Sequence, residues 1–160
     1  MAKGMQIVVF SMGKELFGVS IEAVREIVRV PEITAIPDAP PFLEGMINLR
    51  GRILPVVDLR RRLNLSDAQR DKHTRVLITE DEGKLVGLLV DSVSEVMRIA
   101  DGELEPPPEM ISSIGVEYLS AVAKANGRLI SLLDFHKVLG LEDLKKATAA
   151  ARVPSENQAA

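Results

Sequence analysis

The hydrophobic residues of this chain fall in short runs separated by glycine, proline or charged clusters. Runs of about four to eight residues rich in valine, isoleucine and leucine are typical of β-strands. Between two pairs of runs, at residues 12–15 and 80–84, glycine and charged residues predict hairpin turns. The clearest apolar runs cover residues 7–10, 27–30, 53–57, 76–79 and 85–90.

This pattern occurs twice in the chain. Residues 7–30 align with residues 76–99 without a gap, and residues 51–59 align with residues 127–135 after a short insertion. Each copy of about 70 residues has the size of a small barrel. We therefore predict an all-β fold of two five-stranded barrels, related by internal duplication and carrying a few short helices.

Local signals in the two copies predict finer features. Gly18 and Gly87 interrupt strands at equivalent positions, which indicates a bulge or a sharp bend in each copy. Asp58 and Asp134 each precede a short segment of helical character and are suited to cap it. Further helices are predicted at 21–24, 90–93 and 141–152, followed by a disordered tail at 153–160.

Composition narrows the range of functions. The 160 residues carry a net charge of −3, and only 3% are aromatic, which disfavours nucleic-acid binding. The chain has no cysteine, so disulfides, thiolate metal sites and cysteine nucleophiles are excluded. No apolar run approaches the roughly 18 residues that a membrane span requires. We expect a cytoplasmic protein that does not insert into a membrane.

Residues that support catalysis or metal binding do not cluster in the sequence. His73 and His136 lack histidine or carboxylate neighbours at metal-ligand spacing, and no phosphate-binding loop or hydrolase motif occurs. Because Asp58 and Asp134 are equivalent by duplication, a capping role explains them better than a catalytic pair. We expect no enzymatic activity, no cofactor and no metal. A small-ligand-binding barrel remains as an alternative.

Two charged residues interrupt apolar segments of the first copy. Glu26 lies among valines and isoleucines, and Arg50 lies in the turn Asn48–Gly51 between two apolar strands. A tight turn with positive φ explains the asparagine and the glycine. If the barrel brings Glu26 close to Arg50, the two side chains can pair. An exposed pair contributes only about 0–1 kcal/mol to stability, so we interpret these residues as functional.

The segment Gly-Met-Ile-Asn-Leu-Arg-Gly-Arg-Ile-Leu-Pro-Val-Val-Asp-Leu at residues 45–59 resembles the characteristic block of CheW, the adaptor family of bacterial chemotaxis. The resemblance extends over about residues 5–142. It implies two SH3-like five-stranded barrels around a hydrophobic centre, and no catalysis. It also implies a single CheW-like domain over 1–160, with one subdomain at about 14–70 plus contributions from the chain ends and a second at about 75–140.

The resemblance further implies partners. Proteins of the CheW family connect the regulatory domain of the histidine kinase CheA to the cytoplasmic tip of transmembrane chemoreceptors, within receptor arrays at the membrane. A related chemosensory pathway, such as pilus-based motility, is the alternative. By position, the implied receptor-binding residues are Val24, Glu26, Gly45, Asn48 and Arg50. Of these, Val24 and Gly45 are explained equally well as core or turn residues. The implied kinase-binding residues are Arg75, Val76, Val93, Glu109 and Met110, the last two in a proline-rich loop.

Overall fold

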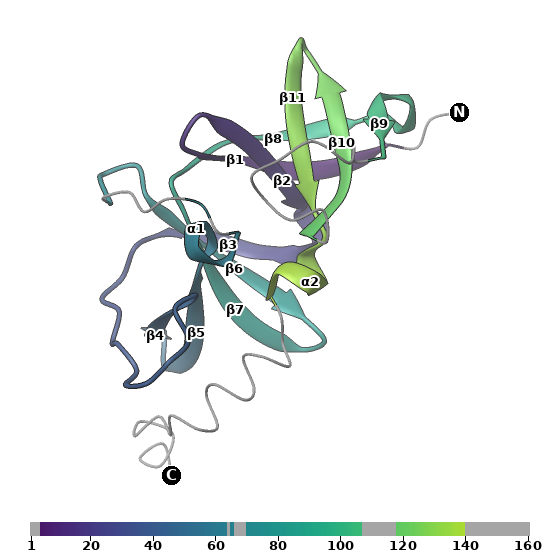
Figure 1. Cartoon of the computed structure of the whole chain (residues 1–160). Helices are drawn as coiled ribbons and strands as arrows, with labels where there is room; N and C mark the ends of the chain where they lie inside the picture. The colour runs from purple at the N-terminus through teal and green to yellow at the C-terminus, as the bar shows by residue number, and fades with distance from the viewer. Residues whose placement is uncertain (1–3, 64, 66–69, 107–117, 140–160) are drawn as a thin grey trace.

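The computed structural model describes residues 4–63, 65, 70–106 and 118–139, and within them it forms two β-sheets with short helical turns (Figure 1). This confirms the predicted all-β fold. The six-stranded sheet has the order β8 (Ser92–Ile99), β1 (Met5–Met12), β2 (Glu15–Ser20), β11 (Arg128–Leu133), β10 (Leu119–Ala125) and β9 (Leu104–Glu105). The five-stranded sheet has the order β3 (Val24–Arg29), β6 (Arg75–Asp81), β7 (Lys84–Val90), β5 (Arg52–Asp58) and β4 (Leu43–Leu49).

The two sheets repeat one topology. When the duplicated segments are matched, the order β3-β6-β7-β5-β4 becomes β8-β1-β2-β11-β10. The single parallel pairing also repeats, since Val56 lies opposite Gly87 in one sheet and Leu132 lies opposite Gly18 in the other. The internal duplication predicted from the sequence is therefore present in the strand order and in the register.

Each sheet takes its first hairpin from the other copy. Strands β6 and β7 of the second copy pair with β3 and β5 of the first, whereas β1 and β2 pair with β8 and β11. The parallel pairings join the two copies, because β2 lies beside β11 in one sheet and β7 lies beside β5 in the other. Strands from both sides of the expected subdomain boundary at residues 70–75 enter each sheet, so a cut there does not separate the two sheets.

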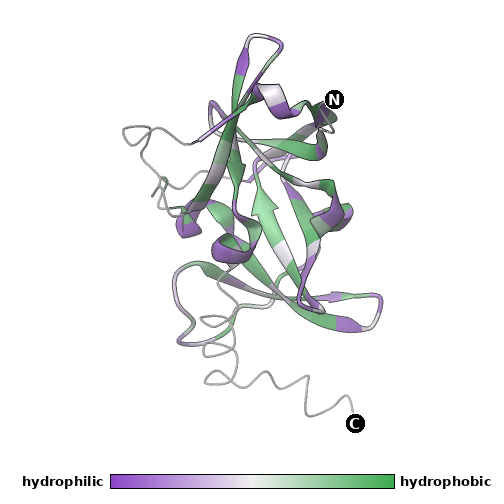
Figure 2. Cartoon of the chain, turned by 90° about the vertical axis from the view of Figure 1, so that its right-hand side faces the viewer, coloured by the Kyte–Doolittle hydropathy of each residue, from purple (hydrophilic) through white to green (hydrophobic). Residues whose placement is uncertain are grey.

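Three hydrophobic clusters hold the sheets together. Alternate residues of β1 serve two of them, because Ile7 and Val9 face the interior of the six-stranded sheet while Val8 and Phe10 face a central cluster shared with the other sheet. Strand β6 behaves in the same way, with Leu77 in the central cluster and its neighbours in a third cluster inside the five-stranded sheet. Burial on both faces explains the unbroken apolar runs at residues 7–10 and 76–78. Figure 2 shows in green the hydrophobic stretches that run along the strands.

The bulge predicted as one possibility at the two strand glycines is absent. Strand pairing continues without a register shift at Gly18 and Gly87, so neither forms a bulge. A Cβ atom on Gly18 would lie 2.9 Å from Cδ1 of Ile7, and one on Gly87 would lie 2.8 Å from Cγ1 of Val76. Neighbouring side chains pack over these positions, so a larger residue there would force those side chains to shift. The register shifts occur instead where β3, β4, β8 and β10 pair with their neighbours.

Short helices follow the two aspartates as predicted. Helix α1 (Leu59–Arg62) begins after Asp58, whose Oδ1 accepts hydrogen bonds from the N–H groups of Arg60 at 3.0 Å and Arg61 at 3.4 Å. Helix α2 (Phe135–Leu139) follows Asp134, whose Oδ1 accepts a bond from the N–H of Lys137 at 3.2 Å. Desolvation raises the pKa of Asp58 above its ordinary value, despite the bonds it accepts from α1.

The remaining helix predictions had mixed outcomes. The 3₁₀ turn η1 (Ile21–Ala23) confirms the helical segment at 21–24. A second 3₁₀ turn, η2 (Asp101–Glu103), was not predicted. The helix predicted at 90–93 is wrong, because β7 continues to Val90 and β8 begins at Ser92. The helix expected at 141–152 and the tail at 153–160 lie outside the described residues.

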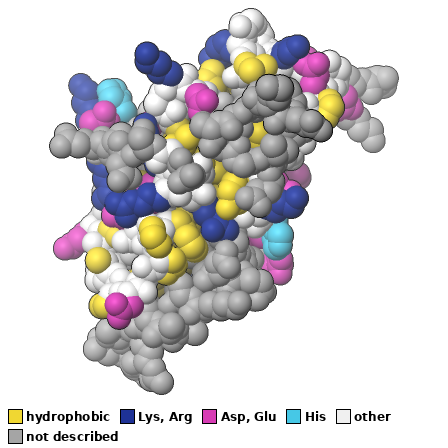
Figure 3. Space-filling model, in the orientation of Figure 1, with side chains coloured by type: hydrophobic (Ala, Val, Ile, Leu, Met, Phe, Trp, Pro, Cys, Tyr) yellow, Lys and Arg dark blue, Asp and Glu magenta, His cyan; other side chains and the backbone are white. Residues whose placement is uncertain are grey.

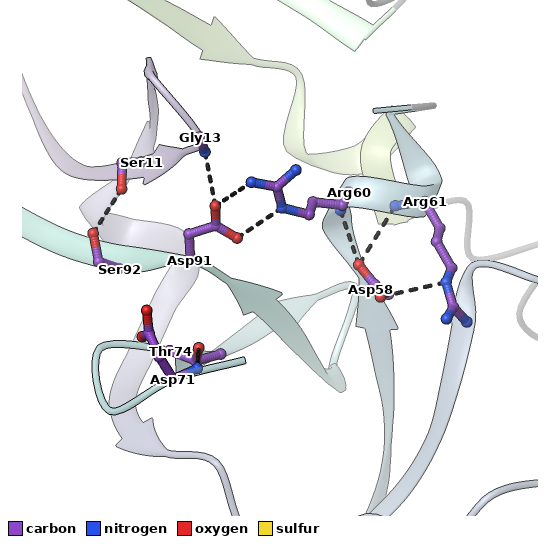
Figure 4. A network of polar contacts seen from close by, with 9 residues as sticks. All are labelled: Ser11, Gly13, Asp58, Arg60, Arg61, Asp71, Thr74, Asp91 and Ser92. Atoms are coloured by element: carbon purple, nitrogen blue, oxygen red, sulfur yellow. Dashed lines mark hydrogen bonds and ion pairs between the residues drawn. The ribbon is translucent and has the colours of Figure 1, made fainter. Parts of the chain in front are cut away.

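Polar contacts cross between the two sheets near α1. The Asp91 carboxylate accepts a hydrogen bond from the Gly13 N–H at 2.7 Å and two from the Arg60 guanidinium, one of them from Nε at 2.9 Å (Figure 4). Burial alone would raise the pKa of Asp91, but these bonds and the Arg60 charge outweigh it and hold the pKa below its ordinary value. Asp91 thus ties the β1–β2 turn to α1.

Arg62 joins equivalent points of the two copies. Its guanidinium carbon lies 4.5 Å from the centre of the Phe42 ring and 5.4 Å from the centre of the Tyr118 ring. Phe42 and Tyr118 are equivalent by the duplication, and each accepts a backbone hydrogen bond from the aspartate that caps the following helix. Arg62 also donates from Nε to the Val138 carbonyl at 2.9 Å, so it connects α1 to the end of α2.

Candidate partner-binding site

The open end of the five-stranded sheet forms a hollow of about 450 Å³, which we call the mouth. Its floor is apolar and continuous with the cluster inside the sheet, because Leu54 and Ile78 belong to both. Its rim is charged. The lining residues are Leu49, Leu54, Ile78 and Leu85 on the floor and Arg25, Glu26, Arg50, Arg52 and Glu80 on the rim. On the face drawn in Figure 3, hydrophobic side chains are exposed beside basic ones over the lower half of the molecule.

The turn between β4 and β5 places Arg50 on this rim. Arg50 and Gly51 have φ values of 51° and 87°, and the Asn48 side chain accepts a hydrogen bond from the Gly51 N–H at 2.9 Å. This confirms the predicted tight turn. In the second copy the same turn holds Asn126 and Gly127, with φ values of 52° and 73°. Asparagine suits this left-handed position, whereas other side chains such as arginine occupy it at a conformational cost.

Glu26 and Arg50 form an ion pair across the rim, which confirms that the barrel brings them together. Their side chains are 34% and 68% exposed, respectively. The hydrogen bond to Glu26 and its negative charge raise the pKa of Arg50. A pair this exposed adds little to stability, and the turn itself does not favour arginine. Folding stability alone therefore does not explain the arrangement.

Val24 and Gly45 lie away from the rim. Val24 is half-buried against the central cluster and pairs with Thr79, so it faces the other side of β3 from Glu26. Gly45 is buried, and a Cβ atom there would lie 2.3 Å from the Thr34 carbonyl oxygen. The need for glycine at position 45 is thus explained by close backbone packing. Asn48 is exposed and acts through the turn. Of the predicted residues, Glu26 and Arg50 are the two whose side chains line the mouth.

The residues expected to bind the kinase are more scattered. Arg75 lines a second hollow of about 460 Å³ and lies directly opposite Arg29 on β3. Val93, at the start of β8, is half-buried against the central cluster. Val76 is 0% exposed inside the five-stranded sheet, so its side chain is closed to a partner. The inward face of β6 explains this difference from the expectation. Glu109 and Met110 lie outside the described residues.

One group of possible metal ligands was missed at the sequence level. Nδ1 of His136 lies 2.6 Å from Oδ2 of Asp81 and 3.3 Å from Oε2 of Glu82. The hydrogen bond to Asp81, together with the nearby negative charges, raises the pKa of His136. These three side chains, of which Asp81 is half-buried and the other two are exposed, could hold a metal ion. Sequence spacing gave no sign of the group, because α2 reaches the β6–β7 turn only in the folded chain. His73 is exposed and lies apart from this group.

The rim contains further charges that sequence reasoning did not select. Arg25 pairs with Glu80 on the neighbouring strand, and Arg52 follows the Arg50 turn. Comparison of the two copies gives a signal for this site, because Arg50 replaces the asparagine that the second copy has in the same turn. Among the described residues, Thr74 and Thr79 are the only buried polar ones, so no buried cluster of catalytic groups is present there. The described helices include none long and apolar enough to span a membrane.

Duplicated barrels with a charged, accessible mouth define a binding module, and the comparisons with known proteins agree. Residues 6–143 match the CheW-like domain. The chain is 33% identical over 146 residues to chemotaxis protein CheW of Treponema pallidum, covering 88% of this chain and 85% of the relative. It is 33% identical over 132 residues to protein FrzA of Myxococcus xanthus, covering 81% and 82%.

A solved structure agrees with the fold. The scaffolding protein TtCheW from Thermoanaerobacter tengcongensis superimposes with a TM-score of 0.80 and 38% sequence identity, covering 88% of this chain and 94% of the other. The sequence matches and this structural likeness together identify the family of the chain. The chain belongs to the CheW-like domain family, and its two sheets are the SH3-like units of that fold.

Proposed function

We propose that this protein is a non-catalytic scaffold that couples chemoreceptors to the histidine kinase CheA in a chemosensory pathway. Family membership supports this role, since the relatives are named as chemotaxis proteins and a structural neighbour is titled a scaffolding protein. The single observation that carries the proposal is the exposed Glu26–Arg50 pair over an apolar floor. Arg50 lies in a turn where the second copy has asparagine.

The mouth is the proposed receptor-binding site. A helical hairpin, the form expected of the receptor tip, can place apolar side chains on Leu49 and Leu54 while Glu26 and Arg50 fix its register. Charged groups of this kind contribute orientation and specificity more than raw affinity. Gly45 and Asn48 support the site indirectly, through close packing and through the turn. Val24 faces away from the mouth, so we do not place it in direct contact with the receptor segment.

The kinase is proposed to bind elsewhere on the molecule. Arg75 and Val93 are the two expected contacts that have accessible surface among the described residues. They lie near the path from β7 to β8, because Arg75 pairs with Val90 and Val93 follows three residues later. We propose the regulatory domain of CheA as the occupant of this surface, with Glu109 and Met110 in a further array contact. The protein would then act in the cytoplasm, at receptor arrays.

Two alternatives concern the pathway and the class of protein. The likeness to FrzA leaves open a related chemosensory pathway with the same coupling role. A small-ligand-binding barrel is disfavoured, because the interior of the five-stranded sheet is filled by its own side chains. Ile47, Val56 and Val76 there are at most 1% exposed.

A reconstituted kinase assay tests the coupling role. Membranes carrying a chemoreceptor are mixed with CheA, with and without this protein, and CheA autophosphorylation is measured with and without attractant. We expect kinase activity to become receptor-dependent and attractant-sensitive only when the protein is present. Unchanged kinase activity, with no binding of the protein to receptor or to CheA, would contradict the proposal.

A further inference from the structure

The duplication allows the rim of the mouth to be compared residue by residue with the equivalent positions of the second copy. In the second barrel, Arg128 on β11 pairs with Glu95 on β8, with Nη2 2.9 Å from Oε2. The equivalent residues of the first barrel are Arg52 on β5 and Glu26 on β3. An unbroken symmetry would therefore pair Arg52 with Glu26.

The first barrel departs from this symmetry. Glu26 pairs with Arg50 instead, whereas the residue equivalent to Arg50 is the neutral Asn126. Arg52 is exposed on the rim, and its side chain makes no hydrogen bond or ion pair with any residue in the described part of the chain. The extra cation at position 50 has thus displaced the cation at position 52 from its carboxylate.

The displaced guanidinium leaves an excess of positive charge around an apolar floor. Of the three rim arginines, Arg25 is neutralised by Glu80 and Arg50 by Glu26, which leaves the charge of Arg52 unbalanced. Guanidinium groups bind carboxylates in a planar, often bidentate geometry, and this geometry gives specificity. A partner that lays apolar residues on the floor and carries an aspartate or glutamate beside them matches both features.

We propose that Arg52 binds a carboxylate side chain of the protein segment that docks in the mouth. The inference rests on the proposed function, because it assumes that the mouth receives a receptor segment. It adds the chemical requirement that this segment present an acidic residue next to its apolar contact surface. Arg52 then fixes the partner through its charge, separately from the Glu26–Arg50 pair.

The test uses a soluble receptor-tip fragment in two forms, one intact and one with its aspartates and glutamates changed to asparagines and glutamines. Binding is measured by isothermal titration calorimetry for the parent protein, Arg52→Gln, Arg52→Lys and the matched control Arg128→Gln. We expect Arg52→Gln to weaken binding of the intact fragment by about tenfold and to have no further effect on the neutral fragment. Arg128→Gln should bind like the parent, and Arg52→Lys should recover part of the loss.

The outcomes separate this inference from the proposed function. If the intact fragment binds the parent and Arg52→Gln equally well, the inference about Arg52 is wrong, whereas the receptor site stands if Arg50→Asn still loses binding. If Arg52→Gln and Arg128→Gln weaken binding equally, the effect is one of overall charge and the inference is also wrong. If the parent protein does not bind the intact fragment at all, the proposed function fails together with the inference.

Discussion

Replacing Gly45 by alanine should destabilise the protein strongly, although the resemblance to CheW implies a receptor contact at this position. The added Cβ atom would lie 2.3 Å from the carbonyl oxygen of Thr34 and 2.7 Å from Cγ2 of Ile33. A backbone oxygen cannot rotate away, so the segment at 33–34 has to move. That movement breaks the bridge between Thr34 and Met46, whose two backbone hydrogen bonds are each 2.9 Å long.

The magnitude follows from these two effects. Overpacking of a tight site costs about 1–3 kcal/mol, and each lost hydrogen bond removes about 0.5–1.5 kcal/mol. We therefore expect Gly45→Ala to lower the free energy of unfolding by about 2–6 kcal/mol. For a chain of this size, such a loss lowers the melting temperature by roughly 4–24 °C.

Urea unfolding followed by far-ultraviolet circular dichroism measures this change, and Gly102→Ala is the matched control. Gly102 lies in η2, has no heavy atom within 4 Å of its added Cβ, and is not in the left-handed region. The control should stay within about 0.5 kcal/mol of the parent. If Gly45→Ala is as stable as the control but no longer binds the receptor fragment, Gly45 is a direct contact and the packing argument is wrong.

Three further changes test the junction between the sheets and the histidine group. Asp91→Asn should lower the free energy of unfolding at pH 7 by about 1–3 kcal/mol, because it weakens the charge-assisted bonds to the guanidinium. Folding lowers the pKa of Asp91, so its contribution to stability is present above the unfolded-state pKa near 4 and is lost as the pH falls through the folded-state pKa. Urea unfolding of the parent and of Asp91→Asn should therefore show a smaller difference in unfolding free energy at pH 3 than at pH 7. Arg62→Met should cost about 1–2 kcal/mol by removing the bond to α2 while keeping an apolar stem between the rings, and an unchanged melting temperature would contradict the junction role. Asp81→Asn should lower the pKa of His136, because the hydrogen bond to the Asp81 carboxylate is the largest cause of its raised pKa. An NMR titration of His136 measures this change, and an unshifted titration would show that the pair does not form in solution.

The fold could be predicted from the sequence in its main features but not in its strand exchange. Spacing and alternation locate strands and turns, and the repeat implies two similar sheets. Neither property tells which edge a hairpin joins, because β1–β2 and β6–β7 carry equivalent apolar faces that fit both sheets. In the same way, a strand glycine indicates an unusual position without distinguishing a bulge from close packing, as at Gly18 and Gly87.

The site was predictable where charge interrupted the apolar pattern. Glu26 and Arg50 could be paired on that basis, whereas Val76 could not be excluded until the face of β6 was known. The importance of Arg52 depends on which carboxylate each arginine reaches, and that is a property of the folded rim. The replacement of asparagine by arginine between the copies was the one available clue at the sequence level.

The most direct test of the central claim is the binding of Arg50→Asn to its two proposed partners. The substitution gives the first turn the residue that the second copy has at Asn126, so the fold should be at least as stable as the parent. Isothermal titration calorimetry is run against the receptor-tip fragment and against the regulatory domain of CheA. We predict at least about a tenfold loss of receptor affinity with unchanged affinity for CheA. Equal loss of both partners, or loss of neither, would contradict the assignment of the mouth as the receptor site.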